Sequence, residues 1–473
     1  MVLNENLERF LKYLQFKGAC AAYQESNPIR FDKDLAERTL VILEQKQEEK
    51  VEALKKVMPL VPKYKTKVYP AKMYNQDETL SAHGHKWFKF LREQKLPVST
   101  KEDVRYVYDH TGPNPNSPEQ VKDWLFGLGW EPCTFDYKKN MDGVERAIPQ
   151  IRSGGELTDS VMLLVDKHED VMELEELTVI NHRISVFNGF INNATEKDGK
   201  FYLTASIHGL TNTLRFKHMA PLVNLPGVDK AYGKEIRGCL IADDGEVMVG
   251  CDMVSLEDTT KRHYMQPLDP DYVEEMSKDG FDPHLDLAKF AGVIFQEDID
   301  EYNTGSESKL KPVRKVYKAA NYSCVYGVRP KTLSRQSGLS MGEASTLIDN
   351  YWERNWSIKR ISSDQKVKES HNYTWLQNPV SGFWYELRYD KDRFSTLNQG
   401  TGVYIFDSWL ARASELGYMG QMQFHDETAV STSDPDQAIA AMKEAIRVLN
   451  DDMNLNVEMK IDYQKGSNYA EIH

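Results

Sequence analysis

The chain has 473 residues, of which 40% are hydrophobic and 28% are charged. This length exceeds that of a single small fold, and the composition excludes a disordered or fibrous protein. No stretch approaches the roughly 18 uninterrupted apolar residues of a membrane-spanning helix, and residues 1–15 lack the apolar segment of a signal peptide. We therefore expect a cytoplasmic protein of several subdomains, without a membrane partner.

The charge and the cysteines of the chain further limit the class of protein to which it can belong. The five cysteines are scattered, without a CxxC pair or a histidine at zinc spacing, so we expect reduced thiols, mostly in the core. A formal charge of −13 is unusual for a nucleic-acid-binding protein, because lysine and arginine make most phosphate contacts. However, residues 53–76 contain six lysines and no carboxylate, and residues 83–95 add positive charge between aromatic side chains. Such runs are usually solvated faces, but beside a nucleic-acid site they would follow the phosphate backbone.

The first part of the chain contains two strong helix signals. Residues 31–58 place apolar residues at spacings of three and four, with aspartate early and lysine late, which predicts a long amphipathic helix. Residues 114–130 offer a Ser-Pro start and a glycine stop around a second helix. We expect irregular, lysine-rich chain between these helices, up to about residue 112, and further helices up to about residue 195.

A sheet is predicted to begin near residue 200. Residues 200–210 and 245–254 are strand-like, and Asp244-Gly245 is a turn signal before the second strand. The elements expected after them are helices over 257–370, strands over 373–389, a helix over 399–415, a hairpin over 418–433, a helix over 435–450 and a strand over 456–463. Because the last strands lie far in sequence from the first, we expect a helical block inserted into the sheet domain.

Two acidic clusters point to a metal site. Asp252 ends the apolar strand GEVMVGC, and Glu257 follows it by five residues, where the next helix should begin. His425, Asp426 and Glu427 stand at the tip of the predicted hairpin, where two adjacent carboxylates would repel each other without a cation. In a two-metal mechanism, two carboxylates from separate elements must converge on the ions. Asp252 and Asp426 can be this pair.

A third cluster lies on a predicted helix that begins near Pro312 and stops at Gly327. Its members recur every four residues and therefore share one slowly rotating face; they are Arg314, Lys318, Tyr322 and Tyr326. Two cations followed by two aromatic rings suit a triphosphate at one end and a base with its sugar at the other.

In this order, the three clusters resemble motifs A, B and C of the family A DNA polymerases, the group of bacterial DNA polymerase I and the polymerases of short-tailed phages. The most specific signals are Arg-x3-Lys-x3-Tyr-x3-Tyr-Gly and Gln-x-His-Asp-Glu. The segment 213–240, the stretch DPHLDLA and the ending GSNYAEIH also resemble the family, so that the resemblance covers roughly residue 30 to the C-terminus. It implies an α+β right-hand fold with a palm, helical fingers and a helical thumb.

The resemblance implies subdomain boundaries as well. We expect an N-terminal helical segment over 1–28, a thumb over 29–135, a first palm part over 136–260, fingers over 261–375 and a second palm part over 376–473. It also implies a template-directed DNA polymerase that adds dNTPs to a primer 3′ end. The metals implied are two Mg²⁺ ions, with Mn²⁺ as a substitute.

The site residues follow from the same resemblance. Asp252 and Asp426 would hold the metals with the backbone carbonyl of Met253, and Glu427 would tune the site without being an obligatory ligand. The residues implied to hold the nucleotide are Arg314, Lys318, His284, Tyr322, Tyr326 and Glu257. Lys318 would also protonate the leaving pyrophosphate. Contacts to primer-template DNA are implied for Arg215, Gln399 and His425.

Two alternatives stay open at this point. A single-subunit RNA polymerase shares much of this pattern but has a small residue at the position of Glu257, so Glu257 favours deoxynucleotides. A catalytically dead accessory subunit would be expected to lose metal-binding carboxylates, and both are present here.

The region before the expected thumb leads to a further expectation. Only about 30 residues precede it, without an Asp-x-Glu on an apolar strand, so we expect no intrinsic 3′–5′ exonuclease. A separate exonuclease or processivity subunit is then a reasonable partner. The expected setting is the cytoplasm of a bacterium, in a phage infection.

Overall fold

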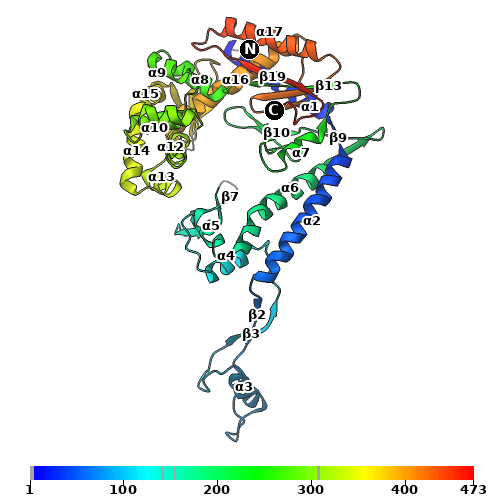
Figure 1. The fold of residues 1–473 in the computed structure, drawn as a ribbon, viewed down its shortest axis with the longest axis vertical. Coiled ribbons are helices and arrows are strands. Elements are labelled where there is room, and N and C mark those ends of the chain that lie inside the picture. Colours follow the sequence, from blue (N-terminus) through cyan, green and yellow to red (C-terminus); the bar gives the residue numbers. More distant parts are fainter. Residues whose placement is uncertain (1–4, 140–142, 154–155, 306–308, 473) are drawn as a thin grey trace. The chain divides into compact units, whose positions relative to one another are not determined.

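The computed structural model describes residues 5–139, 143–153, 156–305 and 309–472. The chain divides into two compact units. The first consists of Met1–Ile42 together with His182–His473, and the second is Leu43–Asn181. Figure 1 shows their helices and strands. No helix among the described residues is long and apolar enough to cross a membrane.

The first unit is built around a four-stranded antiparallel sheet in the order β17-β18-β13-β19. Its strands are β13 (Val247–Met253), β17 (Met422–Phe424), β18 (Glu427–Thr432) and β19 (Ile461–Gly466). Helices α16 (Arg393–Glu415) and α17 (Pro435–Met453) form one apolar core with side chains of β13 and β18. Gly250 in β13 has no room for a Cβ, which would lie 2.7 Å from the side chain of Ile472. The C-terminal segment therefore packs directly on this strand.

A block of helices is inserted between β13 and β17, as the sequence predicted (Figure 1). It consists of α8 (Leu256–Met265), α9 (Pro270–Met276), α10 (Pro283–Phe290), α11 (Gln296–Asn303), α12 (Leu310–Cys324), α13 (Pro330–Ser337), α14 (Met341–Arg354) and α15 (Trp356–Asp364). Helices α10, α12 and α14 share a core of their own. A three-stranded sheet follows, with β14 (Val367–Ser370), β15 (Tyr373–Gln377) and β16 (Trp384–Glu386).

The N-terminal helix α1 (Glu5–Ser26) packs against the elements around the main sheet. Lys17 and Asp407 form a buried ion pair of 2.7 Å between α1 and α16. The Gln24 side chain accepts a hydrogen bond of 3.1 Å from the backbone of Gln423 in β17. The remaining elements of this unit are β1 (Ile29–Phe31), β8 (Thr195–Lys197), β9 (Lys200–Leu203), β10 (Ile207–Leu210), β11 (Phe216–His218), α7 (Gly233–Gly238) and β12 (Leu240–Ile241).

The second unit contains the two helices predicted over 31–58 and 114–130, and also strands that were not predicted. Its elements, with the helices that enter and leave it, are α2 (Lys33–Val57), β2 (Val61–Lys67), α3 (Ala82–Glu93), β3 (Val104–Thr111), α4 (Pro118–Gly127), β4 (Phe135–Lys139), β5 (Glu145–Pro149), β6 (Arg152–Ser153), β7 (Glu156–Leu157), α5 (Asp159–Val165), η1 (Glu169–Met172) and α6 (Glu173–Asn193). The predictions for α2 and α4 are confirmed. Pro118 occupies the first turn of α4 and Gly129 follows its end with φ +89°.

Two predictions for this unit are wrong. The segment up to residue 112 is not irregular, because β2 pairs with β3 and α3 lies between them. Most side chains of this ribbon are exposed on both faces, so its strands lack the apolar alternation by which strands are recognised. Residues 135–157 form short strand pairs rather than helices. Their pairing depends on contacts that local periodicity does not report.

The other predicted elements are confirmed with small shifts of their ends. The helix expected from residue 399 begins at Arg393, and the last strand begins at Ile461 instead of 456. All five cysteines are free thiols. Four of them are buried and Cys133 is exposed, which confirms the expectation of reduced, mostly core cysteines.

Candidate active site

The two aspartates of the predicted metal pair come from adjacent strands of the main sheet. Asp252 is the penultimate residue of β13, and Asp426 lies in the two-residue turn between β17 and β18. The amide of Met253 donates a hydrogen bond of 3.0 Å to the carbonyl of Asp426. His425 enables this tight turn by adopting a left-handed conformation with φ +63°. Backbone pairing therefore holds the aspartate-bearing segments next to each other.

The register of the sheet adds a carboxylate that the sequence analysis did not find. Asp252 lies opposite Glu427 in β18 and opposite Asp462 in β19. Residues directly opposite each other in antiparallel strands face the same side of a sheet. Three carboxylates from three neighbouring strands thus share one face near the strand ends. Asp462 lies in a predicted strand, but only the pairing of β19 with β13 brings it beside Asp252.

Burial perturbs the ionisable groups of the hairpin turn. The pKa of Asp426 is raised, mainly by desolvation and also by the charge of Glu427, while Arg215 opposes this shift. The pKa of His425 is lowered to about 4, first by desolvation and then by the nearby Arg215 and His218. His425 is therefore neutral at physiological pH, and Asp426 has an electrostatic cost that a cation would offset.

Glu427 is held by a hydrogen bond from the C-terminal segment. The hydroxyl of Tyr469 donates to its carboxylate at 2.6 Å, and Tyr469 is itself only 2% exposed. The guanidinium of Arg237 lies 4.8 Å from the centre of the Tyr469 ring. This fixes Glu427 in place beside Asp426. Tyr469 belongs to the C-terminal stretch GSNYAEIH, whose local pattern predicts no role for it; only the folded chain places it here.

A first cavity opens beside the hairpin turn. It has a volume of about 340 Å³, and Asp426 and His425 form one part of its lining. Arg215, Glu257 and Gln399 also line it. The first unit thereby brings together three of the residues predicted to contact DNA, from the segment before β11, from α16 and from the turn.

A second cavity of about 350 Å³ shares Glu257 and Gln399 with the first. Its lining also includes His284, Tyr322 and Tyr326. The pKa of Tyr326 is raised, mainly by burial and secondly by the charge of Glu257, so these two side chains are close in space. Tyr322 is 62% exposed, which leaves its ring open to a bound molecule. Lys261, which the sequence analysis did not single out, lines this cavity too.

The cations of α12 lie on the stripe that the four-residue spacing predicted. The ammonium of Lys318 lies 5.8 Å from the centre of the Tyr322 ring, and the His284 ring is 5.7 Å from the same ring. Arg314 forms an ion pair of 2.6 Å with Asp282, the residue that caps α10. The pKa of His284 is lowered, mainly by desolvation and further by nearby cations, so its imidazole is neutral at pH 7.

The acidic residues fit a divalent cation that takes part of its ligands from a substrate. Within the described part of the chain, no group of three or more histidine, cysteine or carboxylate side chains forms a metal site by itself. The described residues therefore do not form a structural metal site in which every ligand is a protein side chain. Mg²⁺ in nucleotide sites is bound through one or two carboxylates together with substrate phosphates and water. The raised pKa of Asp426 and the pairing of its hairpin with the strand of Asp252 suit that arrangement.

Comparison with known proteins gives one family. The pattern of DNA polymerase family A matches residues 92–379. DNA polymerase I of Helicobacter pylori is 24% identical over 355 residues, which cover 72% of this chain and 36% of that protein. DNA polymerase I of Bacillus subtilis is 22% identical over 397 residues, covering 80% and 42%. The DNA polymerase of Mycobacterium phage D29 is 27% identical over 240 residues, covering 49% and 36%.

The fold is also found among solved structures. The polymerase domain of Pol1 from M. smegmatis, in complex with DNA primer-template and dNTP, matches with a TM-score of 0.64. The sequences are 17% identical, and the match covers 96% of this chain and 69% of that one. The chain has the α+β right-hand fold of a polymerase domain, and it spans 36% to 42% of the length of the curated relatives named above. Since the family pattern covers more than half of its residues, the chain belongs to DNA polymerase family A.

Proposed function

We propose that this chain is a template-directed DNA polymerase that adds dNTPs to a primer 3′ end by two-metal phosphoryl transfer. The observation that carries the proposal is the convergence of Asp252 and Asp426, whose strands are joined by the Met253 amide and the Asp426 carbonyl. Asp426 and Arg215 line one cavity, which shares Glu257 and Gln399 with a second cavity lined by the exposed Tyr322. Separate places for a primer-template and for a nucleotide support this activity.

The metal ligands we propose are the side chains of Asp252 and Asp426 and the backbone carbonyl of Met253. When bound, two Mg²⁺ ions would lower the pKa of the primer 3′-hydroxyl and neutralise charge on the transferred phosphoryl group. Mn²⁺ would substitute. The hydrogen bond from Tyr469 keeps Glu427 beside Asp426, so that Glu427 adjusts the local charge without being a required ligand.

For the incoming nucleotide we propose a site in the second cavity. Arg314, Lys318 and His284 would bind the triphosphate, and Lys318 would give a proton to the leaving pyrophosphate. Tyr322 and Tyr326 would pack against the nucleoside, with Glu257 closing the space beside C2′ of the sugar. The proximity of Glu257 to Tyr326 and of His284 to Tyr322 supports this arrangement.

For DNA we propose contacts from Arg215, Gln399 and His425, which line the first cavity. The solved Pol1 structure contains primer-template and dNTP, which supports these two partners here. The lysine-rich segments 53–76 and 83–95 would add contacts to the phosphate backbone. Most lysines of β2 and α3 are exposed, as such contacts require.

We further propose a palm, fingers and thumb for this chain. The palm is the main sheet with α16 and α17, within the expected segments 136–260 and 376–473. The fingers are the helices α9 to α15, within the expected segment 261–375. The thumb is the expected segment 29–135, most of which falls in the compact unit Leu43–Asn181.

For the 473-residue polypeptide itself we propose that it has no 3′–5′ exonuclease activity. Before α2, the described residues form one helix and one short strand, and neither contains the Asp-x-Glu expected of such an exonuclease. A separate exonuclease or processivity subunit would then be a partner. We also propose a role in phage DNA replication in a bacterial cytoplasm; one relative of this chain is the DNA polymerase of Mycobacterium phage D29.

Primer extension tests this function. Purified protein is incubated with a labelled primer-template, Mg²⁺ and either dNTPs or NTPs. We expect extension with dNTPs, directed by the template, and none when Asp252 and Asp426 are both replaced by asparagine. A mismatched primer end without dNTPs should stay intact. Failure of the wild-type protein to extend the primer with Mg²⁺ or Mn²⁺ would reject the proposed activity.

A further inference from the structure

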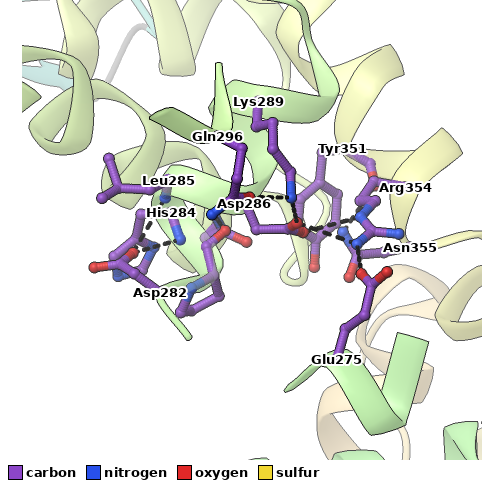
Figure 2. A network of polar contacts seen from close by, with 12 residues as sticks. Glu275, Asp282, His284, Leu285, Asp286, Lys289, Gln296, Tyr351, Arg354 and Asn355 are labelled. Carbon is purple, nitrogen blue, oxygen red and sulfur yellow. Dashed lines mark hydrogen bonds and ion pairs between the residues drawn. The ribbon is translucent and has the colours of Figure 1, made fainter. Parts of the chain in front are cut away.

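Asp282 makes an unusual set of contacts for a helix cap. One carboxylate oxygen accepts hydrogen bonds from the backbone amides of His284 and Leu285, at 2.8 and 3.1 Å, in the first turn of α10 (Figure 2). The other oxygen accepts from Nε of Arg314 on α12 at 2.6 Å. The same carboxylate thus fixes the backbone of His284 and the side chain of Arg314, two of the three groups proposed to bind the triphosphate.

The contact with Arg314 leaves most of its guanidinium available. An arginine carries five N–H donors, and Asp282 takes the one on Nε, so the four on the terminal nitrogens can still bind phosphate. Within the described residues, the Arg314 side chain donates its hydrogen bond to Asp282. The Asp282 side chain is 16% exposed and that of Arg314 is 34% exposed. The carboxylate is thus more buried than the guanidinium that it binds.

A second contact fixes α12 at the same end of α10. The side chain of Asn321 donates a hydrogen bond of 3.1 Å to the carbonyl of Pro283. Asn321 is two helical turns after Arg314, and Lys318 lies between them on the same stripe. Two polar contacts and a shared apolar core therefore determine how this face of α12 meets the start of α10.

Helix α10 is also anchored through a carboxylate of its own first turn. Asp286 accepts two hydrogen bonds from Arg354 of α14, at 2.9 and 3.1 Å, and Arg354 also contacts Glu275 at 2.6 Å (Figure 2). Asp286 is 4% exposed. This network holds α10 in the helical block without touching Arg314. The carboxylate of Asp286 therefore helps to orient α10, whereas the carboxylate of Asp282 orients the Arg314 side chain.

We propose that Asp282 is a positioning residue for nucleotide binding, which holds the Arg314 guanidinium with its terminal N–H groups toward the triphosphate. This inference rests on the proposed function and adds to it a residue that does not touch the substrate. A free arginine side chain samples many rotamers, and fixing it before binding lowers the entropic cost of gripping a phosphate. The low pKa of Asp282 agrees with this role: burial raises it, but the hydrogen bonds from Arg314 and the backbone outweigh that effect.

The carboxylate of Asp282 also has an effect that opposes nucleotide binding. A negative charge next to Arg314 weakens the attraction between the guanidinium and a triphosphate. If that effect dominated, removing the charge would improve nucleotide binding. We expect the positional effect to dominate, because Asp282 binds Nε and leaves the terminal N–H donors of Arg314 for the phosphate.

Three substitutions of Asp282 separate positioning from capping. Asparagine and serine keep a side-chain cap for α10, whereas alanine removes it. None of the three can form the ion pair with Arg314. We expect the KM for dNTP to rise about tenfold in all three, at the lower end of the 10- to 100-fold effects of losing an outer-shell partner, with kcat changed much less. Thermal stability should fall most in Asp282→Ala, which loses the cap as well as the ion pair.

A matched control removes a comparable cap elsewhere in the helical block. Ser340 caps α14 by accepting a hydrogen bond of 3.2 Å from the amide of Glu343, and among the described residues its hydrogen bonds do not involve the proposed nucleotide site. Ser340→Ala should lower stability as Asp282→Ala does and leave the KM unchanged. A rise in KM that followed stability across all four variants would overturn the proposal, because loosening of the helices would then explain it.

A double-mutant cycle with Arg314→Ala decides whether Asp282 acts through the arginine. We expect Asp282→Asn to raise the KM in the wild-type background and to have no further effect once Arg314 is gone. Equal effects in both backgrounds, or tighter nucleotide binding in Asp282→Asn, would overturn the proposal. The dissociation constant of dATP is measured in parallel by equilibrium dialysis. If the wild-type protein binds dATP but extends no primer, the proposed activity is rejected, and the effect of Asp282 on dATP binding can still be measured. If it binds no dATP, both the activity and the role of Asp282 are rejected.

Discussion

Shortening Glu257 to alanine should weaken discrimination against ribonucleotides. Glu257 occupies the first turn of α8, and its backbone carbonyl accepts a hydrogen bond of 2.8 Å from Asn398, so its position is well defined. Its side chain lines the proposed nucleotide cavity together with Tyr326 and raises the pKa of that tyrosine. A ribonucleotide would place its 2′-hydroxyl against this pair of side chains.

The size of the effect follows from the polarity of this contact. A buried hydroxyl that loses its hydrogen bonds costs about 1 to 3 kcal/mol. This corresponds to roughly a 5- to 150-fold penalty in rate for the ribonucleotide, before any steric clash is counted. Removing the Glu257 side chain opens space beside Tyr326, so we expect most of this penalty to disappear even if total activity falls.

The assay compares kcat/KM for a dNTP with that for the matching NTP in single-nucleotide primer extension. Glu257→Gln keeps the bulk and should retain most of the discrimination, whereas Glu257→Ala should lose it. Glu274→Ala, which removes an exposed carboxylate from α9, is the control and should behave as the wild type. A wild-type ratio near one, or a ratio that Glu257→Ala does not change, would show that Glu257 does not select the sugar.

Further predictions concern the metal pair and the nucleotide. Asp252→Asn and Asp426→Asn should each lower the rate of nucleotide addition at least about 100-fold with little loss of primer-template affinity; smaller losses in single-turnover assays would contradict the metal assignment. The raised pKa of Asp426 means that its ionised form destabilises the fold, so Asp426→Asn should raise the Tm at pH 8, less so as the pH falls through the carboxyl pKa. Mg²⁺ should raise the Tm of the wild type more than that of Asp426→Asn, and equal shifts would reject this ligand. Tyr322→Phe should reduce dideoxynucleotide incorporation relative to dNTPs in competition assays, since Tyr322 would fill the place of the missing 3′-hydroxyl; unchanged discrimination would assign that pocket to another group.

Local patterns in the sequence were enough to predict most elements of the first unit. The strand before Asp252, the hairpin around Asp426 and the stripe of α12 carry period-two or near-helical spacing together with clear turn residues. These signals depend on neighbours within one turn or one strand, which a sequence displays directly. The same locality explains why the beginnings and ends of some helices shifted by several residues.

The pairing of β2 with β3 could not be predicted from local sequence patterns. Its partner strands are about 40 residues apart, and their exposed faces give no apolar alternation. The prediction of helices between residues 135 and 157 was wrong for a related reason. Strands of two and five residues are stabilised by their pairing rather than by their own composition.

Spacing and resemblance were enough to select the residues that we propose for the chemistry: the aspartates, the cations of α12 and the two tyrosines. Which other groups lie beside them followed from the folded chain alone. Asp462 lies opposite Asp252 through strand register, Tyr469 reaches Glu427 from the C-terminal segment, and Asp282 reaches Arg314 across two helices. Each of these contacts joins residues at least 32 positions apart. The physical reason is that a side chain's partners depend on packing and register between elements, which no local pattern of residues specifies.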